Sequence, residues 1–190
     1  MKKPVAILFI LFAAVSCTEV PPTLSTIQIS SLDGLPVRTD FINGNYASVF
    51  VFLAPDCPLS QNYTLTLNRL YENYIDSSVF FYGIIPGNSH PAEKVQEFAS
   101  KYQIGYPVFF DHNLTLTKFL NATTTPEVFV ASFDEKIIYH GAIDNWATAL
   151  GDHRQVITEH YLDDALKSFV SRKEITIKET KPVGCLIERK

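Results

Sequence analysis

Three cysteines are the residues of this sequence best suited to do chemistry. Cys57 begins the tetrapeptide Cys-Pro-Leu-Ser directly after a long apolar segment, and Cys185 lies close to the C-terminus. The third, Cys17, follows an apolar stretch near the N-terminus. Three cysteines are too few to staple a miniprotein, and their spacing does not match a zinc site. We therefore expect any reaction to depend on one or two thiols.

The position of Cys57 favours a reactive thiolate. The apolar run 47–53 predicts a buried strand, and the periodic apolar residues after Cys57 predict a helix, which places the sulfur at a helix N-terminus. The helix dipole there favours the thiolate, which is the nucleophilic form of cysteine. Pro58 suits the first helical turn, and Ser60 can donate a hydrogen bond to the sulfur. Asp56 acts in the opposite direction because a nearby negative charge disfavours the thiolate.

Cys185 is the candidate partner thiol. It lies in a polar tail, residues 173–190, where Lys181 and Arg189 are expected to lower its pKa. We expect this tail to be exposed or weakly packed, so that Cys185 can reach Cys57. Three outcomes stay open: a working redox pair, a permanent structural disulfide, or two unpaired thiols of which Cys57 is only a small buried apolar side chain.

The elements that must position these thiols alternate between strand and helix. Strands are expected at 26–30, 47–53, 78–85, 107–110, 127–132 and 136–140, and helices after Cys57, from 91 to 102, at 113–120 and around 162–169. This order predicts an α/β fold, with a central mixed sheet flanked by helices on both faces. We assign residues 26–172 to one domain, with an N-terminal strand and a C-terminal extension.

The N-terminus has the composition of an export signal. Residues 1–16 carry Lys2 and Lys3 ahead of an apolar run. This run is shorter than the roughly 20 apolar residues needed to span a bilayer. The residues before Cys17 resemble the lipobox of bacterial lipoproteins, which implies that Cys17 is acylated and that 17–25 form a lipid-anchored tether. The expected location is the cell envelope, facing the periplasm or the exterior, with a soluble secreted protein as the alternative.

Charge and composition exclude several classes of protein. The chain has 16 Lys plus Arg against 20 Asp plus Glu, and no basic stripe, so nucleic acid is not expected as a partner. A hydrophobic content of 46% is typical of a folded chain rather than a disordered one. Glu127 and Asp144 could relay protons, but carboxylates on loops are expected to be exposed and solvated.

Three segments, taken in order, resemble the thioredoxin superfamily, specifically its redoxin branch of peroxiredoxin-like and extracytoplasmic thioredoxin-like proteins. Residues 49–58 are a strand running into a cysteine, and 106–111 are similar to the insert strand of redoxins. Residues 124–130 match the place where the family has a cis-proline that faces the cysteine. The resemblance covers about residues 25–170 and implies a thioredoxin-like fold.

The resemblance also implies a function and a site. The expected reaction is thiol–disulfide exchange, with Cys57 as nucleophile and Cys185 as a remote resolving thiol, because Ser60 stands where thioredoxins have their second cysteine. Thr125 and Pro126, joined by a cis bond, would hold the backbone of the substrate beside Pro58. The expected substrates are protein thiols or disulfides, or small thiols and peroxides. No organic cofactor is implied, because sulfur itself carries the electrons.

Two alternatives stay open. A thiol peroxidase is the first, although Ala54 stands where peroxiredoxins have the Thr that binds peroxide, and no Arg lies between residues 120 and 153. The second is a non-catalytic binding protein in which both thiolates and His90 or His140 hold copper, since soft sulfur ligands select Cu(I). The resemblance by itself implies no resident metal.

Overall fold

A seven-stranded mixed sheet forms the centre of the fold in the computed structural model, which describes residues 22–189. The strand order is β2-β1-β5-β4-β3-β7-β8. In chain order these strands are β1 (Gln28–Ser30), β2 (Pro36–Arg38), β3 (Ala47–Phe52), β4 (Val79–Pro86), β5 (Val108–Asp111), β7 (Glu127–Ser132) and β8 (Ile137–Gly141). Strands β3, β4 and β5 run parallel, whereas β7 is antiparallel to β3, and this confirms the predicted mixed α/β sheet.

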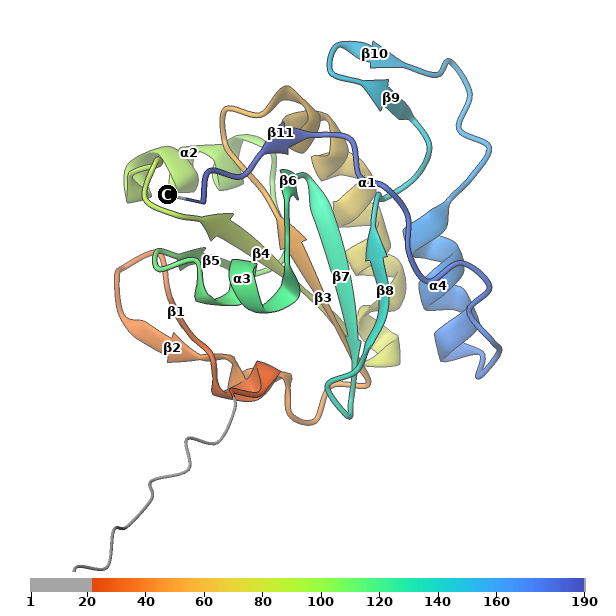
Figure 1. Cartoon of the computed structure of the whole chain (residues 1–190), viewed down its shortest axis with the longest axis horizontal. Helices are drawn as coiled ribbons and strands as arrows, with labels where there is room; N and C mark the ends of the chain where they lie inside the picture. The colour runs from red at the N-terminus through yellow and green to blue at the C-terminus, as the bar shows by residue number, and fades with distance from the viewer. Residues whose placement is uncertain (1–21, 190) are drawn as a thin grey trace, which may run out of the picture.

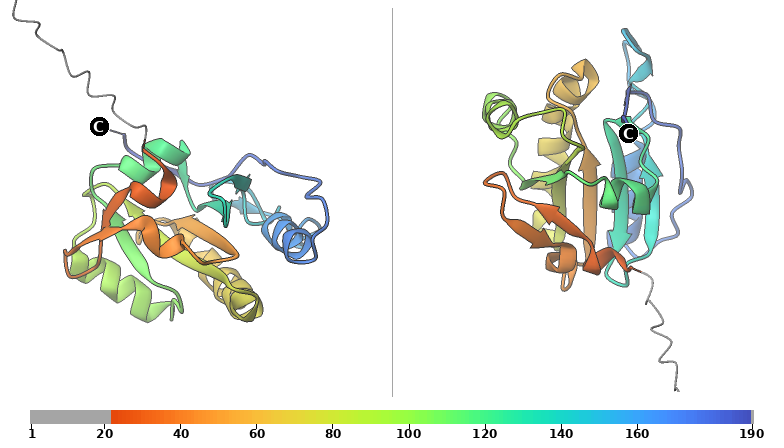
Figure 2. Two further views of the ribbon diagram at one scale, coloured as in Figure 1. Left: turned by 90° about the horizontal axis from the view of Figure 1, so that it is seen from below. Right: turned by 60° about the vertical axis from the view of Figure 1, so that its left-hand side comes forward.

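Helices cover both faces of the sheet (Figures 1 and 2). They are α1 (Pro58–Tyr74), α2 (Ala92–Lys101), α3 (Thr115–Leu120) and α4 (Tyr161–Val170). Leu67 of α1, Val95 of α2 and Leu162 of α4 belong to the same core cluster as Val49 of β3. Leu116 of α3 belongs to the cluster on the opposite face. The two faces of the sheet therefore carry separate apolar cores.

The sequence explains why β3 lies in the middle. All six of its residues are buried, and it pairs with β4 on one side and β7 on the other. A strand that is covered on both faces needs apolar side chains at every position rather than at alternate ones. The run 47–53 meets this requirement at every position except Ser48, whose buried hydroxyl accepts a hydrogen bond from the Asn45 side chain. The run leads directly to Cys57 at the edge of the core.

The predicted helices and principal strands are confirmed, with shifts of a few residues at their ends. Pro91, expected in the first turn of a helix, instead lies just before α2 as its N-cap residue. Several short elements were not predicted: β2, the 3-10 turns η1 (Leu24–Thr26), η2 (Thr39–Ile42) and η3 (Ile75–Ser77), and two small two-stranded sheets. Those sheets pair β9 (Ala147–Ala149) with β10 (Asp152–His153), and β6 (Thr124–Thr125) with β11 (Cys185–Leu186).

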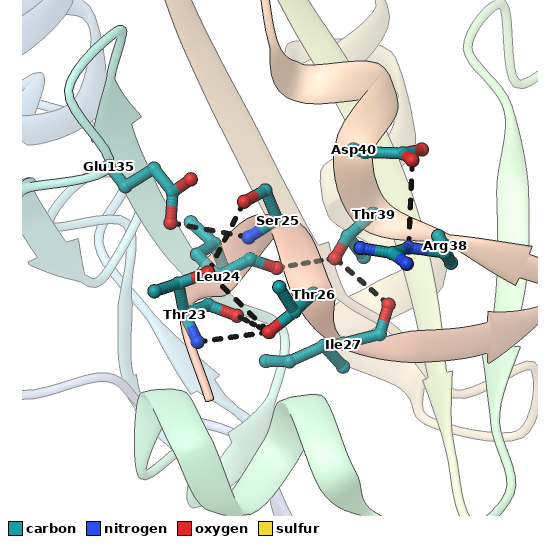
Figure 3. A network of polar contacts seen from close by, with 9 residues as sticks. All are labelled: Thr23, Leu24, Ser25, Thr26, Ile27, Arg38, Thr39, Asp40 and Glu135. Atoms are coloured by element: carbon teal, nitrogen blue, oxygen red, sulfur yellow. Dashed lines mark hydrogen bonds and ion pairs between the residues drawn. The ribbon is translucent and has the colours of Figure 1, made fainter. Parts of the chain in front are cut away.

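The start of the described chain is held by a small polar network (Figure 3). The buried hydroxyl of Thr39 donates to the carbonyl of Ile27 at 3.0 Å and also to the carbonyl of Leu24. The backbone N–H of Ser25 donates to the Glu135 carboxylate at 3.2 Å, across to the β7–β8 turn. This network ties the first described residues to the end of the sheet away from β6 and β11 (Figure 1).

The C-terminal tail is mostly exposed, as expected, but backbone hydrogen bonds hold it against the fold. It runs from α4 along β8 and then across the end of the sheet to β6 (Figure 1). The N–H of His140 donates to the carbonyl of Lys178, and the N–H of Thr180 donates to the carbonyl of His140. Near its end, the Arg189 guanidinium donates to the side-chain oxygen of Asn121. Backbone pairing, which no side-chain pattern reports, holds the tail in place.

The export and anchoring predictions fall mainly on residues that the structure does not describe. The signal at 1–16 and the lipidation residue Cys17 lie outside the described range, as does most of the tether at 17–25. Within residues 22–189, no helix combines the length and the apolar character needed to cross a bilayer.

Candidate functional site

Cys57 lies where the sequence placed it, at the junction of a strand and a helix. It is the N-cap residue of α1, with extended backbone angles, and Pro58 is the first helical residue. Its carbonyl accepts the first helical hydrogen bond from the N–H of Gln61. The side chain is buried, with 1% of the residue exposed. The helix N-terminus thus faces a sulfur that solvent barely reaches.

The structure brings the two predicted thiols together. The Cys185 Sγ donates to the Cys57 Sγ across 2.7 Å, and the Cys57 Sγ donates to the carbonyl oxygen of Thr125 at 3.0 Å. Both cysteines are free thiols. Two residues that lie 128 positions apart in the chain therefore form a dithiol that can become a disulfide by losing two electrons and two protons.

Backbone pairing positions Cys185. Strand β11 runs antiparallel to β6, with Cys185 opposite Thr125, and the N–H of Ile187 donates to the carbonyl of Thr123 at 2.9 Å. Gly184 makes this approach possible, because a Cβ at that position would overlap the Thr125 carbonyl and lie 3.3 Å from the Pro126 nitrogen. A glycine directly before a cysteine was the available signal for this close contact.

The loop that faces the sulfurs is built as the resemblance implied. The Thr125–Pro126 bond is cis, which confirms the prediction. The Glu127 carboxylate accepts hydrogen bonds from the N–H of Thr123 at 2.7 Å and from the N–H of Thr124 at 3.0 Å. The expectation that Glu127 is solvated was wrong, because the residue is 3% exposed. It holds the loop rather than relaying protons at the surface.

Hydrogen bonds favour the thiolate of Cys57. Burial acts to raise the pKa of Cys57, but hydrogen bonds from the Cys185 thiol and from both the N–H and hydroxyl of Ser60 outweigh it, so the pKa is lowered. The Ser60 hydroxyl oxygen itself accepts the N–H of Ala54 at 3.2 Å, which orients the group. Ser60 acts on the pKa of Cys57 in the direction that the sequence interpretation gave it, and its role in the reaction stays a prediction.

The expectation for the pKa of Cys185 was wrong. Its pKa is raised to about 12 by burial, by its hydrogen bond and charge interaction with Cys57, and by the negative charge of Asp56. Arg189 does not lower it, because that guanidinium binds Asn121 instead. Asp56 likewise acts on Cys185 and not, as expected, on the sulfur of Cys57. The pair is thus strongly asymmetric, with Cys57 the thiol that ionises first.

His90 contacts Asp56 beside the thiols, which the sequence interpretation did not foresee. From the sequence it was named only as an alternative copper ligand. In the structure its side chain is 8% exposed and its Nε2 lies 3.3 Å from the Asp56 carboxylate. Burial lowers the pKa of His90, so the neutral form, with Nε2–H toward Asp56, suits this position. The His90 Nδ1 is buried without a hydrogen-bond partner. The pairing fixes Asp56 beside the thiols.

A cavity of about 610 Å³ opens beside the two sulfurs. Both cysteines line it, together with Asp56, His90 and Thr125. A smaller cavity of about 200 Å³ lies beyond Pro126 and is lined by Tyr63 and Asp144 but by neither cysteine. The larger cavity is therefore the one through which a small reactant can meet the redox pair.

Asp144 and His140 do not join the thiols. The buried Asp144 carboxylate accepts the Tyr63 hydroxyl at 2.6 Å and the N–H of Trp146 at 2.8 Å, so its expected exposure was wrong. His140 stacks on Phe129 and lines a different cavity. Among residues 22–189, no group of three or more His, Cys, Asp or Glu side chains is arranged to hold a metal ion.

Comparison with known proteins places this geometry in a family context. The family model described as "AhpC/TSA family" matches residues 22–140 of the chain. A search of curated proteins by sequence found no match.

Solved structures share the fold at low sequence identity. An uncharacterized conserved protein from Geobacillus kaustophilus has a TM-score of 0.77 and 22% identity, with 89% of this chain and 91% of that chain covered. A hypothetical protein from Sinorhizobium meliloti has a TM-score of 0.76 and 19% identity, with coverages of 87% and 92%. A secreted Mycobacterium tuberculosis disulfide oxidoreductase has a TM-score of 0.54 and 18% identity, with coverages of 77% and 96%. These likenesses confirm a thioredoxin-like fold.

Proposed function

Because the chain belongs to the AhpC/TSA family, we propose that it is a thiol–disulfide oxidoreductase whose working unit is the pair Cys57 and Cys185. The observation that carries this proposal is the 2.7 Å separation of the two sulfurs, one on a helix N-terminus and the other on a strand docked beside the cis-proline. Thiol-based redox chemistry is common to the family. In this chain the partner of Cys57 is a cysteine of the C-terminal tail.

The asymmetry of the pair supports a division of roles. Cys57 has the lowered pKa and is the internal nucleophile. A disulfide substrate first exchanges with Cys185: the substrate's sulfur–sulfur bond breaks, one of its sulfurs leaves, and the other is bound to Cys185 as a mixed disulfide. The Cys57 thiolate then attacks the Cys185 Sγ, closes the internal disulfide and expels the second substrate sulfur. Closing the bond transfers two electrons to a disulfide substrate, whose two sulfurs leave as thiols after taking up two protons. The reverse reaction reduces the Cys57–Cys185 bond. Neither direction needs an organic cofactor, because each step exchanges one sulfur–sulfur bond for another.

A peroxidase has weaker support. Ala54 lines the cavity beside Cys57 and offers no hydroxyl to a peroxide. A structural disulfide is the other competing interpretation, because a bridge between these residues would close a long loop and stabilise the fold.

Two measurements test the proposal. The first is the reduction potential of the Cys57–Cys185 pair in a glutathione redox buffer. A potential well above about −300 mV is expected for a working pair, and a value below it would mark a permanent structural bridge.

The second measurement is turnover. Reduction of insulin should be lost in Cys57→Ser and in Cys185→Ser and retained in Cys17→Ser. Hydrogen peroxide consumption, measured on the same three variants, distinguishes a peroxidase, which consumes peroxide, from an oxidoreductase, which reduces only insulin. Full activity of Cys57→Ser in both assays would contradict any catalytic role for this pair.

We also propose that the protein is exported and anchored through Cys17. The support is the sequence alone: Lys2 and Lys3, the apolar run that follows, and the residues just before Cys17. An extracytoplasmic location agrees with a thiol pair that cycles through a disulfide.

A further inference from the structure

The two sulfurs of the pair differ sharply in their access to solvent. Cys57 is 1% exposed, whereas Cys185 is partly exposed and its neighbour Leu186 is 82% exposed. The Cys57 sulfur contacts the Cys185 sulfur and the carbonyl oxygen of Thr125. A reactant that enters the cavity of about 610 Å³ therefore finds Cys185 as the more accessible of the two sulfurs that line it.

The usual approach for an extended peptide is occupied as well. An extended chain can add to an open strand edge by backbone pairing. Here the edge of β6 already pairs with β11, with Cys185 opposite Thr125 and the N–H of Ile187 bonded to Thr123. The chain's own tail takes the place of a substrate strand, and the cavity beside Cys185 stays open.

We propose that, while the tail is docked, external thiols exchange with the protein at Cys185 and not at Cys57. The inference rests on the proposed function, because it assumes that the two cysteines form a disulfide. It changes the expected roles. Cys185 is the sulfur that forms the bond to the reactant, and Cys57 is the internal thiolate that is released when the Cys57–Cys185 bond breaks and that forms this bond again in the reverse reaction. The reactant class that suits the cavity is a small thiol rather than an extended polypeptide.

Each step of this exchange balances. The thiolate of the small thiol attacks the Cys185 Sγ and forms a mixed disulfide, while the Cys57–Cys185 bond breaks and its electron pair stays on Cys57 as a thiolate. A second thiolate of the same class then attacks the external sulfur of the mixed disulfide. Cys185 leaves and takes up a proton, and the small thiol is released as its disulfide. Two small thiols are oxidised and one protein disulfide is reduced.

The local chemistry favours this direction of cleavage. A disulfide breaks more readily when the departing sulfur is the more stable thiolate. Two influences on these pKa values persist when the partner sulfur is bound to the reactant. Hydrogen bonds from Ser60 act to lower the pKa of Cys57, whereas burial and the charge of Asp56 act to raise the pKa of Cys185. Attack at Cys185 expels the better leaving group, and attack at Cys57 would expel the worse one. Access and leaving-group stability therefore point to the same sulfur.

Peptide mapping of the mixed disulfide tests the inference. The full chain, oxidised to the Cys57–Cys185 disulfide, is mixed with excess cysteamine, quenched in acid at successive short times and digested for mass spectrometry. Cysteamine is expected on Cys185 in an excess over Cys57 on the order of tenfold, because attack follows access and leaving-group stability. Predominant labelling of Cys57 would overturn the inference. Failure of air or diamide to form the Cys57–Cys185 disulfide would instead refute the proposed function.

A variant of the tail makes the test sharper. Gly184 does not have a positive φ, so Gly184→Ala introduces no backbone strain, but its Cβ would overlap the Thr125 carbonyl and push the tail off β6. The share of cysteamine on Cys57 is expected to rise at least about fivefold in this variant, because the buried sulfur becomes accessible. Leu186→Ala is the matched control, since it trims an exposed side chain of the same strand.

Hydrogen exchange at Ile187 reports whether the tail has moved, because its N–H is bonded to Thr123 in the docked state. Fast exchange at Ile187 in Gly184→Ala, together with an unchanged labelling pattern, would show that docking does not direct the attack and would contradict the inference. If the Ile187 amide stays protected in Gly184→Ala, the tail is still docked, and the distribution of cysteamine between Cys57 and Cys185 should match that of Leu186→Ala. A larger share on Cys57 in that case would contradict the inference.

Discussion

Ser60 acts to lower the pKa of Cys57, as a nearby positive charge does in many reactive thiol sites. Its N–H and hydroxyl both act to lower the pKa of Cys57, and its hydroxyl oxygen accepts the N–H of Ala54. The hydroxyl is buried, so water does not compete for it. Neutral donors at a helix N-terminus therefore stabilise the thiolate without a nearby Lys or Arg.

Ser60→Ala is expected to raise the pKa of Cys57. The variant removes one donor to the thiolate, and the thiolate fraction at neutral pH falls as a result. A lost hydrogen bond of about 1 kcal/mol corresponds to a roughly fivefold slower exchange at neutral pH, with the pH profile moved to higher pH.

The measurement for Ser60→Ala is the ultraviolet absorbance of the thiolate against pH, recorded in a Cys17→Ser background. Ser48→Ala is the control, since Ser48 is also buried but accepts from Asn45 and makes no contact with the thiol pair. An unchanged pKa of Cys57 in Ser60→Ala, or an equal shift in both variants, would show that Ser60 does not stabilise the Cys57 thiolate.

At the scale of elements, the segment from Thr123 to Glu127, which contains β6 and the cis-proline, is held on both sides. The buried Glu127 carboxylate binds the N–H groups of Thr123 and Thr124, and the other edge of the same residues accepts the tail. One side chain thus fixes the strand on which Cys185 is docked.

Glu127→Ala is expected to lower the free energy of unfolding by about 2 kcal/mol, because it leaves backbone donors without their acceptor in a buried place. Urea denaturation of the reduced protein measures this change. Glu72→Ala, an exposed change on α1, serves as the control and should alter stability little. A loss in Glu127→Ala no larger than that of the control would show that water replaces the carboxylate at no cost.

At the scale of the whole molecule, the pair connects the N-terminus of α1 to the last residues of the chain. A disulfide between Cys57 and Cys185 would restrict the unfolded chain far more than the folded one, since 128 positions separate the two residues.

Oxidation is therefore expected to raise the free energy of unfolding by roughly 2–4 kcal/mol. Urea denaturation with and without reductant checks this value, and Cys185→Ser should show no dependence on reductant. Equal stability of the oxidised and reduced wild-type protein would mean that the bridge strains the native fold as much as it restricts the unfolded chain.

Much of the fold could be predicted because side-chain patterns report burial. The apolar run 47–53 marked the central strand, and Tyr63, Leu67 and Leu70 recur at helical spacing and are all buried. The place of Cys57 and the cis bond at Pro126 followed from these elements and from the family resemblance.

The tail and the charges around the site could not be predicted in the same way. A two-residue strand such as β11 has no periodicity, and its position depends on backbone pairing with β6. The pairing of His90 with Asp56 and the burial of Glu127 depend on which loops meet in space. The raised pKa of Cys185 follows from its buried neighbours, although basic residues stand close to it in the sequence.

The separation of the two thiols along the chain also sets the order in which the site can form. Synthesis runs from the N-terminus, so Cys57 is made 128 positions before Cys185, and over that interval a nascent chain carries the first thiol without its partner. All seven strands of the central sheet precede Cys185, so the sheet can be complete before the second sulfur exists. The redox pair is thus a late product of folding, added to a sheet that does not depend on it.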